Sequence, residues 1–304
     1  MTTHIQLLPA HQIDRNKWNR TVSQAENGLI YADTRFLDTM ADNWSGIVVG
    51  DYTAVLPLPW RKKWGISYLY VPPFMQQLGL VGILDKEEVK AVSNLLQQQF
   101  IYGDLHFNFS NSYVASNFSA VKKRKNRITH LLPTYAELSQ SFSGDARRNL
   151  QEAAHHSLHF QEGGEEEAMQ LFLEQMKYKG APSITDMKKF KGLCNEFSST
   201  QQTICRSVVD NNKQLLAAIV GFKDGKRMYN LLNLTTPEGR KKSANYFLFD
   251  QLLREWSGQP LWLDWEGSEL PGVQSFYLHW GGEWENYYHV HLNRLPLPIR
   301  WLKR

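Results

Sequence analysis

Cysteines and long apolar runs are both scarce in this chain. Its two cysteines, Cys194 and Cys205, form no Cys-x-x-Cys motif and have no histidine at ligand spacing. Neither a disulfide framework nor a zinc site is predicted, and we expect no metal in the functional site. No apolar stretch reaches the length of a signal peptide or a membrane span. These absences predict a cytoplasmic protein that is not inserted into a membrane.

The net charge is also small, and the common nucleotide-binding motifs are missing. The 34 Lys and Arg exceed the 30 Asp and Glu by four, which is too small a bias for an obligate nucleic-acid binder. The basic run at residues 122–127 is most simply a solvated connection, with contact to a polyanion as the alternative. Phosphate-loop, dinucleotide and Gly-x-Ser-x-Gly signatures are missing. The common nucleotide-binding and serine-hydrolase classes are therefore not indicated.

The chain contains the same order of elements twice, and its length suits two domains. Alternating apolar patterns, turn residues and one amphipathic helix per half predict strand, strand, strand, helix, strand. In the first half these elements fall at 46–49, 52–58, 66–71, 85–100 and 105–109. In the second half they fall at 203–209, 215–222, 227–234, 243–256 and 261–264. The repetition predicts two related domains in tandem.

The loop before the second helix is the most informative segment. It joins a strand end to a helix N-terminus, where free N–H groups and the helix dipole favour an anion. The residues expected to hold a donor's phosphates are Gly239, Arg240, Lys241, Lys242, Ser243 and Asn245. The corresponding first-half loop, 72–79, has no cation and two prolines, which lack an N–H. We therefore expect an anion site only in the second half.

Further polar residues occur where the same half ends its strands. Asp264 and Glu266 lie on one side of a strand end, where they can act as a general base or orient an amine, or serve as caps or partners for Arg147. Arg147 falls on the predicted inward stripe of a helix, so it needs a buried acid or an anionic ligand. Tyr229 and Asn233 alternate onto one strand face and can line the same cleft.

Three segments resemble a known superfamily. They are Ala146-Arg147-Arg148-Asn149-Leu150-Gln151-Glu152-Ala153, the loop and helix at 239–248, and Leu263-Asp264-Trp265-Glu266-Gly267 with the residues at 271–276 and 281–282. Together they resemble the GNAT acyltransferases, and within them the Fem-like proteins. The resemblance implies an α+β protein with two tandem GNAT-like domains, each a mixed, mostly antiparallel sheet flanked by helices. We expect an N-terminal domain at 1–130 with a degenerate donor site, and a C-terminal domain at 131–292. The apolar tail at 293–304 should pack back on the first half.

The resemblance implies an N-acyltransferase that moves an acyl group from acyl-CoA to a small-molecule or peptide amine. Asp264, Glu266 and Tyr229 would then be catalytic, Arg147 and Asn233 would bind substrate, and the segment from Gly239 to Asn245 would bind the donor. Two alternatives remain open. One is an aminoacyl-tRNA-dependent transferase, for which tRNA is a partner, and the other is a binding protein that keeps the fold without catalysis.

Overall fold

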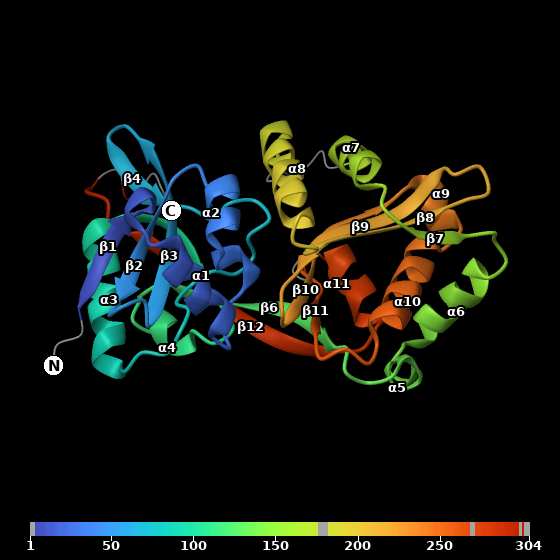
Figure 1. Ribbon diagram of the computed structural model, residues 1–304, viewed down its shortest axis with the longest axis horizontal. Coiled ribbons are helices and arrows are strands. Elements are labelled where there is room, and N and C mark those ends of the chain that lie inside the picture. The colour runs from blue at the N-terminus through green and yellow to red at the C-terminus, as the bar shows by residue number, and fades with distance from the viewer. Residues whose placement is uncertain (1–3, 176–181, 268–270, 298–299, 301–304) are drawn as a thin grey trace. The chain divides into compact units, whose positions relative to one another are not determined.

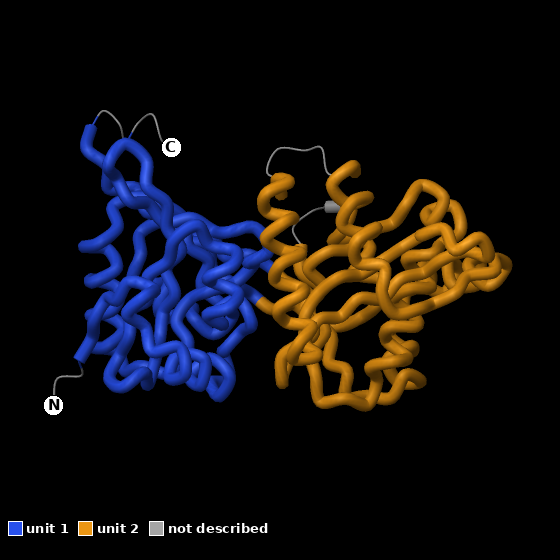
Figure 2. The backbone as a smooth tube through the Cα atoms, turned by 45° about the horizontal axis from the view of Figure 1, so that its top comes forward, with its two compact units in different colours: residues 1–125, 286–304 blue, residues 126–285 orange. Residues whose placement is uncertain are grey.

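A computed structural model describes residues 4–175, 182–267, 271–297 and 300. The chain divides into two compact units (Figure 2), of which unit 1 comprises residues 1–125 and 286–304 and unit 2 comprises residues 126–285. These boundaries differ from the predicted ones at 130/131 and 292/293. The described helices include none with both the length and the apolar character that a membrane crossing requires.

Unit 1 contains strands β1 to β5 and a helix of 14 residues, α3, among shorter helices. Its elements in chain order are β1 (Ile5–Pro9), η1 (Ala10–Gln12), α1 (Arg15–Gln24), η2 (Ile30–Ala32), α2 (Thr34–Met40), β2 (Trp44–Val49), β3 (Ala54–Lys63), β4 (Ile66–Leu69), α3 (Lys86–Gln99), β5 (Tyr102–Phe107) and α4 (Ser112–Ala115). Helix α3 starts at a capping box between Asp85 and Glu88, which satisfies two N-terminal amides.

Unit 2 begins within β6 and ends within β12 (Figure 1). Its elements are β6 (Val121–His130), α5 (Tyr135–Gln140), α6 (Gly144–Ala153), β7 (His159–Glu162), α7 (Glu165–Gln175), α8 (Ile184–Ser198), β8 (Thr203–Val209), β9 (Leu215–Lys223), β10 (Arg227–Thr235), α9 (Pro237–Lys241), α10 (Ala244–Trp256), β11 (Trp262–Asp264), α11 (Pro271–Leu278) and β12 (Glu283–Asn293). The predicted order of three strands, a helix and a strand is present in each unit, as β2-β3-β4-α3-β5 and β8-β9-β10-α10-β11.

The strands form one mixed sheet rather than the two separate sheets that the sequence predicted. Its twelve strands follow the order β1-β2-β3-β4-β5-β12-β6-β11-β10-β9-β8-β7. Both boundaries between the units fall inside strands of this sheet, one within β6 and the other within β12. Two neighbouring pairs, β4 with β5 and β10 with β11, are parallel, and each belongs to a crossover through a helix.

The basic run predicted as a solvated connection is the first half of strand β6. Lys122, Lys123 and Lys125 are exposed, whereas Asn126 to Thr129 are buried. Long lysine side chains can reach water from a strand whose backbone is hydrogen bonded, so charge alone did not exclude a strand here.

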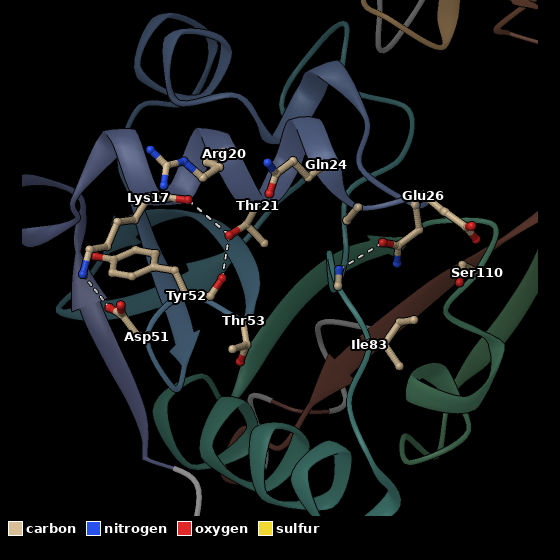
Figure 3. A pocket seen from close by; sticks show the side chains of 13 residues that line it. Lys17, Arg20, Thr21, Gln24, Glu26, Asp51, Tyr52, Thr53, Ile83 and Ser110 are labelled. Carbon is tan, nitrogen blue, oxygen red and sulfur yellow. Dashed lines mark hydrogen bonds and ion pairs between the residues drawn. The ribbon is translucent and has the colours of Figure 1, made fainter.

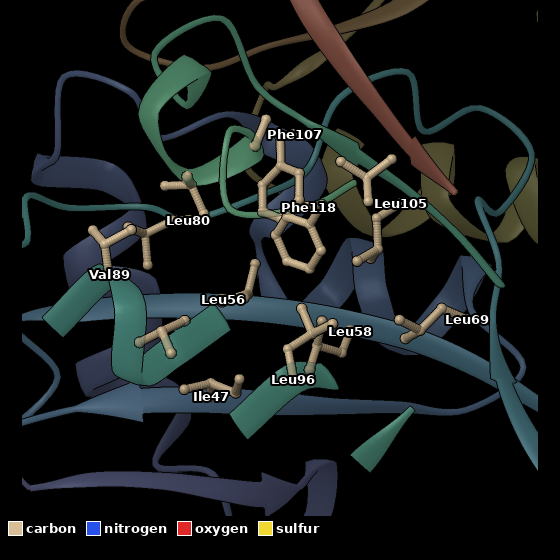
Figure 4. Close-up of a cluster of buried hydrophobic side chains, with 14 of the residues drawn as sticks. Ile47, Leu56, Leu58, Leu69, Leu80, Val89, Leu96, Leu105, Phe107 and Phe118 are labelled. Carbon is tan, nitrogen blue, oxygen red and sulfur yellow. The ribbon is translucent and has the colours of Figure 1, made fainter. Parts of the chain in front are cut away.

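Each unit has its own apolar core. In unit 1 the core gathers side chains from β2, β3, β5 and α3, including Leu56, Leu96 and Phe107 (Figure 4). In unit 2 the core lies around α10, with Phe249, Trp265 and Trp280 fully buried. Leu80, which belongs to no helix or strand, is also buried in the unit 1 core, and its position matters for the site described next.

Candidate functional site

Strands β10 and β11 separate after a short parallel contact. Their pairing begins at Arg227↔Trp262 and ends at Tyr229↔Asp264. Strand β10 also shifts register against β9 between Tyr229 and Leu232, as a β-bulge does. A bulge bends a strand, and here it bends β10 where β11 ends. We call the opening beyond these residues the β10–β11 gap.

Asn230 spans the start of this gap. Its Nδ2 donates to the carbonyl oxygen of Trp265 at 3.3 Å and to the hydroxyl oxygen of Tyr277 at 2.9 Å. The Oδ1 atom of the same side chain is buried and has no hydrogen-bond partner within the described ranges. A buried acceptor without a partner is costly, so this oxygen is suited to receive an N–H from a ligand.

A pocket of about 320 Å³ lies against the part of β10 beyond the bulge. Strand β10, helices α9 and α10, and helix α11 all contribute to its walls. The lining residues are Asn233, Thr235, Gly239, Arg240, Ser243, Asn245, Tyr246, Gly272, Val273, Phe276 and Tyr277. The pocket therefore brings together most of the predicted donor residues with Asn233, while Lys241 and Lys242 are not among its lining residues.

One wall of the pocket is polar and the other is aromatic. Asn233 and Asn245 exchange two amide hydrogen bonds of 3.0 and 3.1 Å. The rings of Tyr246 and Phe276, which also line the pocket, meet edge to face with centroids 5.0 Å apart. Such a pocket can bind a chain that has both amide groups and apolar segments.

The predicted phosphate-binding loop is largely a short helix. Thr236 caps α9 by accepting from the amide of Gly239 at 3.0 Å, and Pro237 occupies the first turn. The amides of Arg240 and Lys242 donate to Thr236 and Glu238 carbonyl oxygens. These amides are therefore engaged within the chain, which corrects the expectation that they point at a ligand.

Gly239 and Ser243 differ in backbone conformation from what a glycine and a serine before a helix lead one to expect. Gly239 is not left-handed but packs on β9, where an added Cβ would lie 2.1 Å from the Leu216 carbonyl oxygen. Ser243 is the left-handed residue, with φ of 51°. Its hydroxyl does not cap α10; it donates to Asn149 Oδ1 of α6 at 2.9 Å. A positive φ at a non-glycine residue next to a pocket is a strained feature of the kind found at binding sites.

The three predicted cations differ in how far they are neutralised. Arg240 is exposed, and its guanidinium donates to the Thr235 carbonyl oxygen at 3.0 Å. Lys241 lies 3.2 Å from Glu238, and Lys242 lies 3.3 Å from Glu238 and 3.8 Å from Asp210. The Lys241 and Lys242 contacts lower the pKa of Glu238. Positive charge at this rim is therefore modest, and Arg240 is the cation that lines the pocket.

Arg147 faces solvent, which contradicts the predicted inward stripe. Within α6 (Gly144–Ala153) the buried residues are Ala146 and Ala153, so the inward stripe lies one residue before the predicted one. The Arg147 guanidinium donates to the carbonyl oxygen of Gln140 at 3.0 Å, at the end of α5. A cation at a helix C-terminus is a stabilising arrangement, and it needs no acidic partner.

Asp264 is fully buried and paired with Arg227. One carboxylate oxygen lies 3.1 Å from the guanidinium, and the other accepts from Asn126 at 2.8 Å. Arg227 also forms two hydrogen bonds with Glu285, of 2.9 and 2.6 Å. Burial raises the pKa of Asp264 to about 6, although the Arg227 charge acts in the opposite direction. The partner of Asp264 is thus Arg227 and not Arg147.

Glu266 lies two residues further on, in a different electrostatic setting. Only 8% of it is exposed, and its backbone is left-handed with φ of 53°. Burial, followed by the negative charge of Glu285, raises the pKa of Glu266 well above its usual range. Burial, and to a smaller extent the charge of Glu266, also raises the pKa of Tyr277, which lines the pocket. Two neighbouring carboxyls with different environments are a common basis for dividing acid–base roles.

Tyr229 does not share a face with Asn233. Its hydroxyl donates to Asp224 Oδ2 at 2.7 Å, whereas Asn233 bonds to Asn245 on α10. The bulge between the two residues adds one position and reverses the alternation. Sequence reasoning also missed Asn230, Tyr277 and Arg227, although an Asn and an Arg within an otherwise apolar strand were signals that could have found two of them.

Unit 1 contains the equivalent parallel pair, but its gap is filled. Strand β4 pairs with β5 only at Leu69↔Gly103, and residues 78–81 then occupy the space between β3 and β5. The Leu78 amide donates to the His106 carbonyl oxygen at 3.1 Å, and Val55 and Val81 exchange backbone bonds of 2.9 and 2.8 Å. We call residues 78–81 the filler segment.

Unit 1 also has a larger, open pocket of about 720 Å³ beside the end of the filler segment (Figure 3). Helix α1, the β2–β3 turn and the residues Gly82 and Ile83 form its walls. Several polar groups there are already paired, including Lys17 with Asp51 at 2.6 Å. None of the predicted site residues lines it. Within the described ranges, no cluster of three or more His, Cys, Asp or Glu has a metal-binding arrangement.

Solved structures share this fold at low sequence identity. FemX is 15% identical, covers 99% of both chains and gives a TM-score of 0.67. A tandem GNAT protein from the clavulanic acid biosynthesis pathway is 9% identical over 96% of this chain and 100% of its own, with a TM-score of 0.54. L-PGS from Bacillus licheniformis is 10% identical over 95% and 94%, with a TM-score of 0.53. No protein-family profile and no curated protein sequence matches the chain. The chain thus has the fold of the GNAT superfamily, in its Fem-like form.

Proposed function

We propose that this protein transfers an acyl group to an amine, with the acyl donor bound in the pocket of unit 2. The observation that carries the proposal is the pocket beside the β10–β11 gap. Its lining combines the left-handed Ser243, the paired amides of Asn233 and Asn245, and Tyr277, to which Asn230 donates. The fold shared with a tandem GNAT protein supports the same reading.

The leading donor is acyl-CoA. Its amide-bearing arm matches the Asn233 and Asn245 wall, and its acyl end matches the Tyr246 and Phe276 wall. Its phosphates would lie at the rim, where Arg240 and Lys241 supply charge-assisted hydrogen bonds. Because the α9 amides are bonded internally, we assign phosphate binding to these side chains and not to a backbone cradle.

Glu266 is the proposed general base. The amine nitrogen attacks the thioester carbonyl carbon, and its proton passes to the Glu266 carboxylate. The carbon–sulfur bond then breaks, and the departing thiolate takes up that proton to leave as the thiol, which returns Glu266 to its carboxylate form. A carboxyl with a raised pKa is a stronger base once ionised, which suits proton removal from an ammonium-derived nucleophile near neutral pH. Asp264 and Arg227 then act as positioning residues that hold the end of β11.

Aminoacyl-tRNA is the alternative donor, and two observations favour it. The α9 helix lacks an open backbone cradle for a diphosphate, and β6 carries exposed Lys122, Lys123 and Lys125. Binding to a nucleic acid releases counterions, so affinity for charged tRNA would fall steeply as salt increases. Affinity for acyl-CoA, with few phosphates, would fall much less.

Titration calorimetry with acetyl-CoA, longer acyl-CoAs and bulk charged tRNA tests the donor site. The blocking variant is Gly272→Trp, because Gly272 lines the pocket and an added Cβ meets no atom within 4 Å. Gly192→Trp on α8 is the matched control, since its Cβ position is equally open. Donor binding lost in Gly272→Trp and kept in Gly192→Trp supports the pocket; binding unaffected by Gly272→Trp contradicts it.

Glu266→Gln tests the chemical step separately. We expect donor affinity to stay unchanged while kcat falls by roughly 10²–10⁴-fold, the usual contribution of a general base. Lys188→Gln, an exposed position on α8, is the control for expression and handling. Turnover that survives in Glu266→Gln removes Glu266 from the mechanism. Donor binding without turnover of any amine by the wild-type protein would instead favour a non-catalytic binding role.

A further inference from the structure

The outer part of the β3–β4 hairpin forms a two-stranded arm. Strand β4 pairs with β5 only at Leu69, so residues 61–67, which we call the hairpin arm, extend beyond the shared sheet (Figure 1). Lys63 pairs with Ile66 across a two-residue turn of Trp64 and Gly65, whose φ angles are 51° and 80°. The arm is therefore a tight hairpin with both turn residues left-handed.

Trp64 is an unexpected residue at this turn. Its side chain is 82% exposed, and no other tryptophan among the exposed large apolar residues of the described chain exceeds 37%. A left-handed position at such a turn favours Asn, Asp or Gly, and a bulky residue there is strained. Both solubility and backbone preference thus oppose a tryptophan here. Where a sequence breaks local preference in this way, a functional constraint is the expected cause.

Positive charge surrounds the exposed ring. Lys62 and Lys63 are exposed, and Lys63 Nζ lies 4.8 Å from the centroid of the Trp64 ring. Arg61 is held differently, because it bonds to Asp42 and lies 4.0 Å over Tyr70. The tip of the arm therefore presents one large amphipathic ring with two lysines beside it.

A further arginine lies at the same end of the sheet. Tyr102 starts β5 and pairs with Asn293, and its ring lies tilted against the ring of Tyr68 in β4 with centroids 6.4 Å apart. The next residue, Arg294, donates its amide to the Ile101 carbonyl oxygen at 2.7 Å. At the base of the arm Arg61 is neutralised by Asp42, so the exposed positive charge is that of Lys62 and Lys63 at the tip, with Arg294 nearby.

We propose that the hairpin arm docks on the surface of an anionic lipid bilayer. Trp64 would enter the headgroup region, where tryptophan rings concentrate, while Lys62 and Lys63 approach anionic headgroups. The tip is too small for a stable protein interface, and it offers one ring instead of the successive stacking rings that bind single-stranded nucleic acid. One ring and two lysines provide peripheral, reversible and salt-sensitive attachment.

Vesicle co-sedimentation of the full chain tests this surface. We expect binding to vesicles that contain phosphatidylglycerol and little binding to pure phosphatidylcholine. Lys62→Gln with Lys63→Gln should weaken binding by about 30-fold, since each lysine near an anionic surface contributes about five- to sixfold. Raising the salt from about 0.1 M to about 1 M, which shortens the Debye length from about 10 to about 3 Å, should have a similar effect.

Trp64→Asn separates docking from folding. Asparagine suits the left-handed turn, so the melting temperature should be kept or raised while vesicle binding falls about tenfold. Lys86→Gln with Lys90→Gln on α3, and Ile83→Asn at an 89% exposed position, are matched controls that should bind as the wild type does. Equal binding by Trp64→Asn and wild type, equal binding to both vesicle types, or Trp64-dependent binding to RNA without vesicle binding would each overturn the proposal.

Discussion

Units 1 and 2 contain the same parallel strand pair joined through a helix, yet the two gaps beyond these pairs are occupied differently. In unit 1 the filler segment lies between β3 and β5 and completes their backbone hydrogen bonds. In unit 2 Asn230 spans the start of the gap, and a pocket follows. Separated strands leave backbone groups that must be satisfied by protein, water or ligand. Unit 1 thus satisfies the backbone groups beside its gap with its own filler segment, whereas unit 2 can satisfy such groups with a bound molecule.

Three asparagines hold the filler segment in unit 1. The Leu80 carbonyl oxygen accepts from the side-chain amides of Asn27, Asn111 and Asn108 at 2.9, 3.0 and 3.3 Å. Asn111 Oδ1 also accepts from the Leu80 amide at 2.8 Å, and Asn27 Oδ1 accepts from Gly82 at 3.0 Å. So complete a set of bonds indicates that the filler is a permanent part of unit 1.

Leu80→Ala should produce the largest change in stability. Leu80 is fully buried in the unit 1 core, so truncation leaves a cavity and should lower the free energy of unfolding by about 3–4 kcal/mol. Urea denaturation measures the loss. Donor affinity of the folded variant should match that of the wild type, because the donor pocket belongs to unit 2. A large loss of donor affinity with little loss of stability would contradict the comparison.

Asn111→Ala should cost somewhat less, about 2–3 kcal/mol. The variant leaves the buried amide of Leu80 without its acceptor and removes one of three donors from the Leu80 carbonyl oxygen. Asn117→Ala is a useful comparison, because its side chain bonds to carbonyls of its own helix region at a more exposed position. If the two variants unfold at the same urea concentration, the filler is not held as described.

Much of the fold could be predicted from the sequence, because strong local patterns correspond to buried elements. The strand β9 is buried along nearly its whole length, and α10 has one apolar face formed by Phe249, Leu252 and Leu253. Helix α9 was missed although Thr236 and Pro237 form a normal helix start, since Gly239 within it suggested a loop. The filler segment was also missed. Its four residues pair only with distant strands, and no local pattern reports such pairing.

Site residues depended on register, and register was the weaker part of the prediction. The bulge in β10 separates Tyr229 from Asn233, and no alternation pattern reveals an inserted residue. Helix α6 likewise buries Ala146, one residue before Arg147, and this leaves Arg147 at the surface. Four residues of the segment from Gly239 to Asn245 do line the pocket. The place of this segment depends on the order of strands and helices, and an error of one residue in strand register does not change that order.

Glu266→Gln should raise stability in a pH-dependent manner. The pKa of Glu266 is raised in the folded chain, so folding favours its neutral form, and the wild-type protein loses stability as pH rises above the unfolded value of about 4.5. Glutamine stays neutral and escapes this loss. The stability difference should therefore be small at pH 4 and grow toward pH 7, by about 1.4 kcal/mol for each pH unit until the folded pKa is reached. Urea melts at both pH values test this, and a difference that is constant with pH would refute it.

The smallest expected effect concerns the rim of the unit 2 pocket. Arg240→Ala with Lys241→Ala should weaken acyl-CoA binding by about five- to tenfold, because exposed charge-assisted contacts to phosphate are partly screened by water and salt. The melting temperature should change by less than about 2 °C, since both side chains lie on the surface. Lys62→Gln with Lys63→Gln in unit 1 removes the same number of charges and should leave donor affinity unchanged. Equal losses in both double variants would mean that net charge, and not the rim of this pocket, attracts the donor.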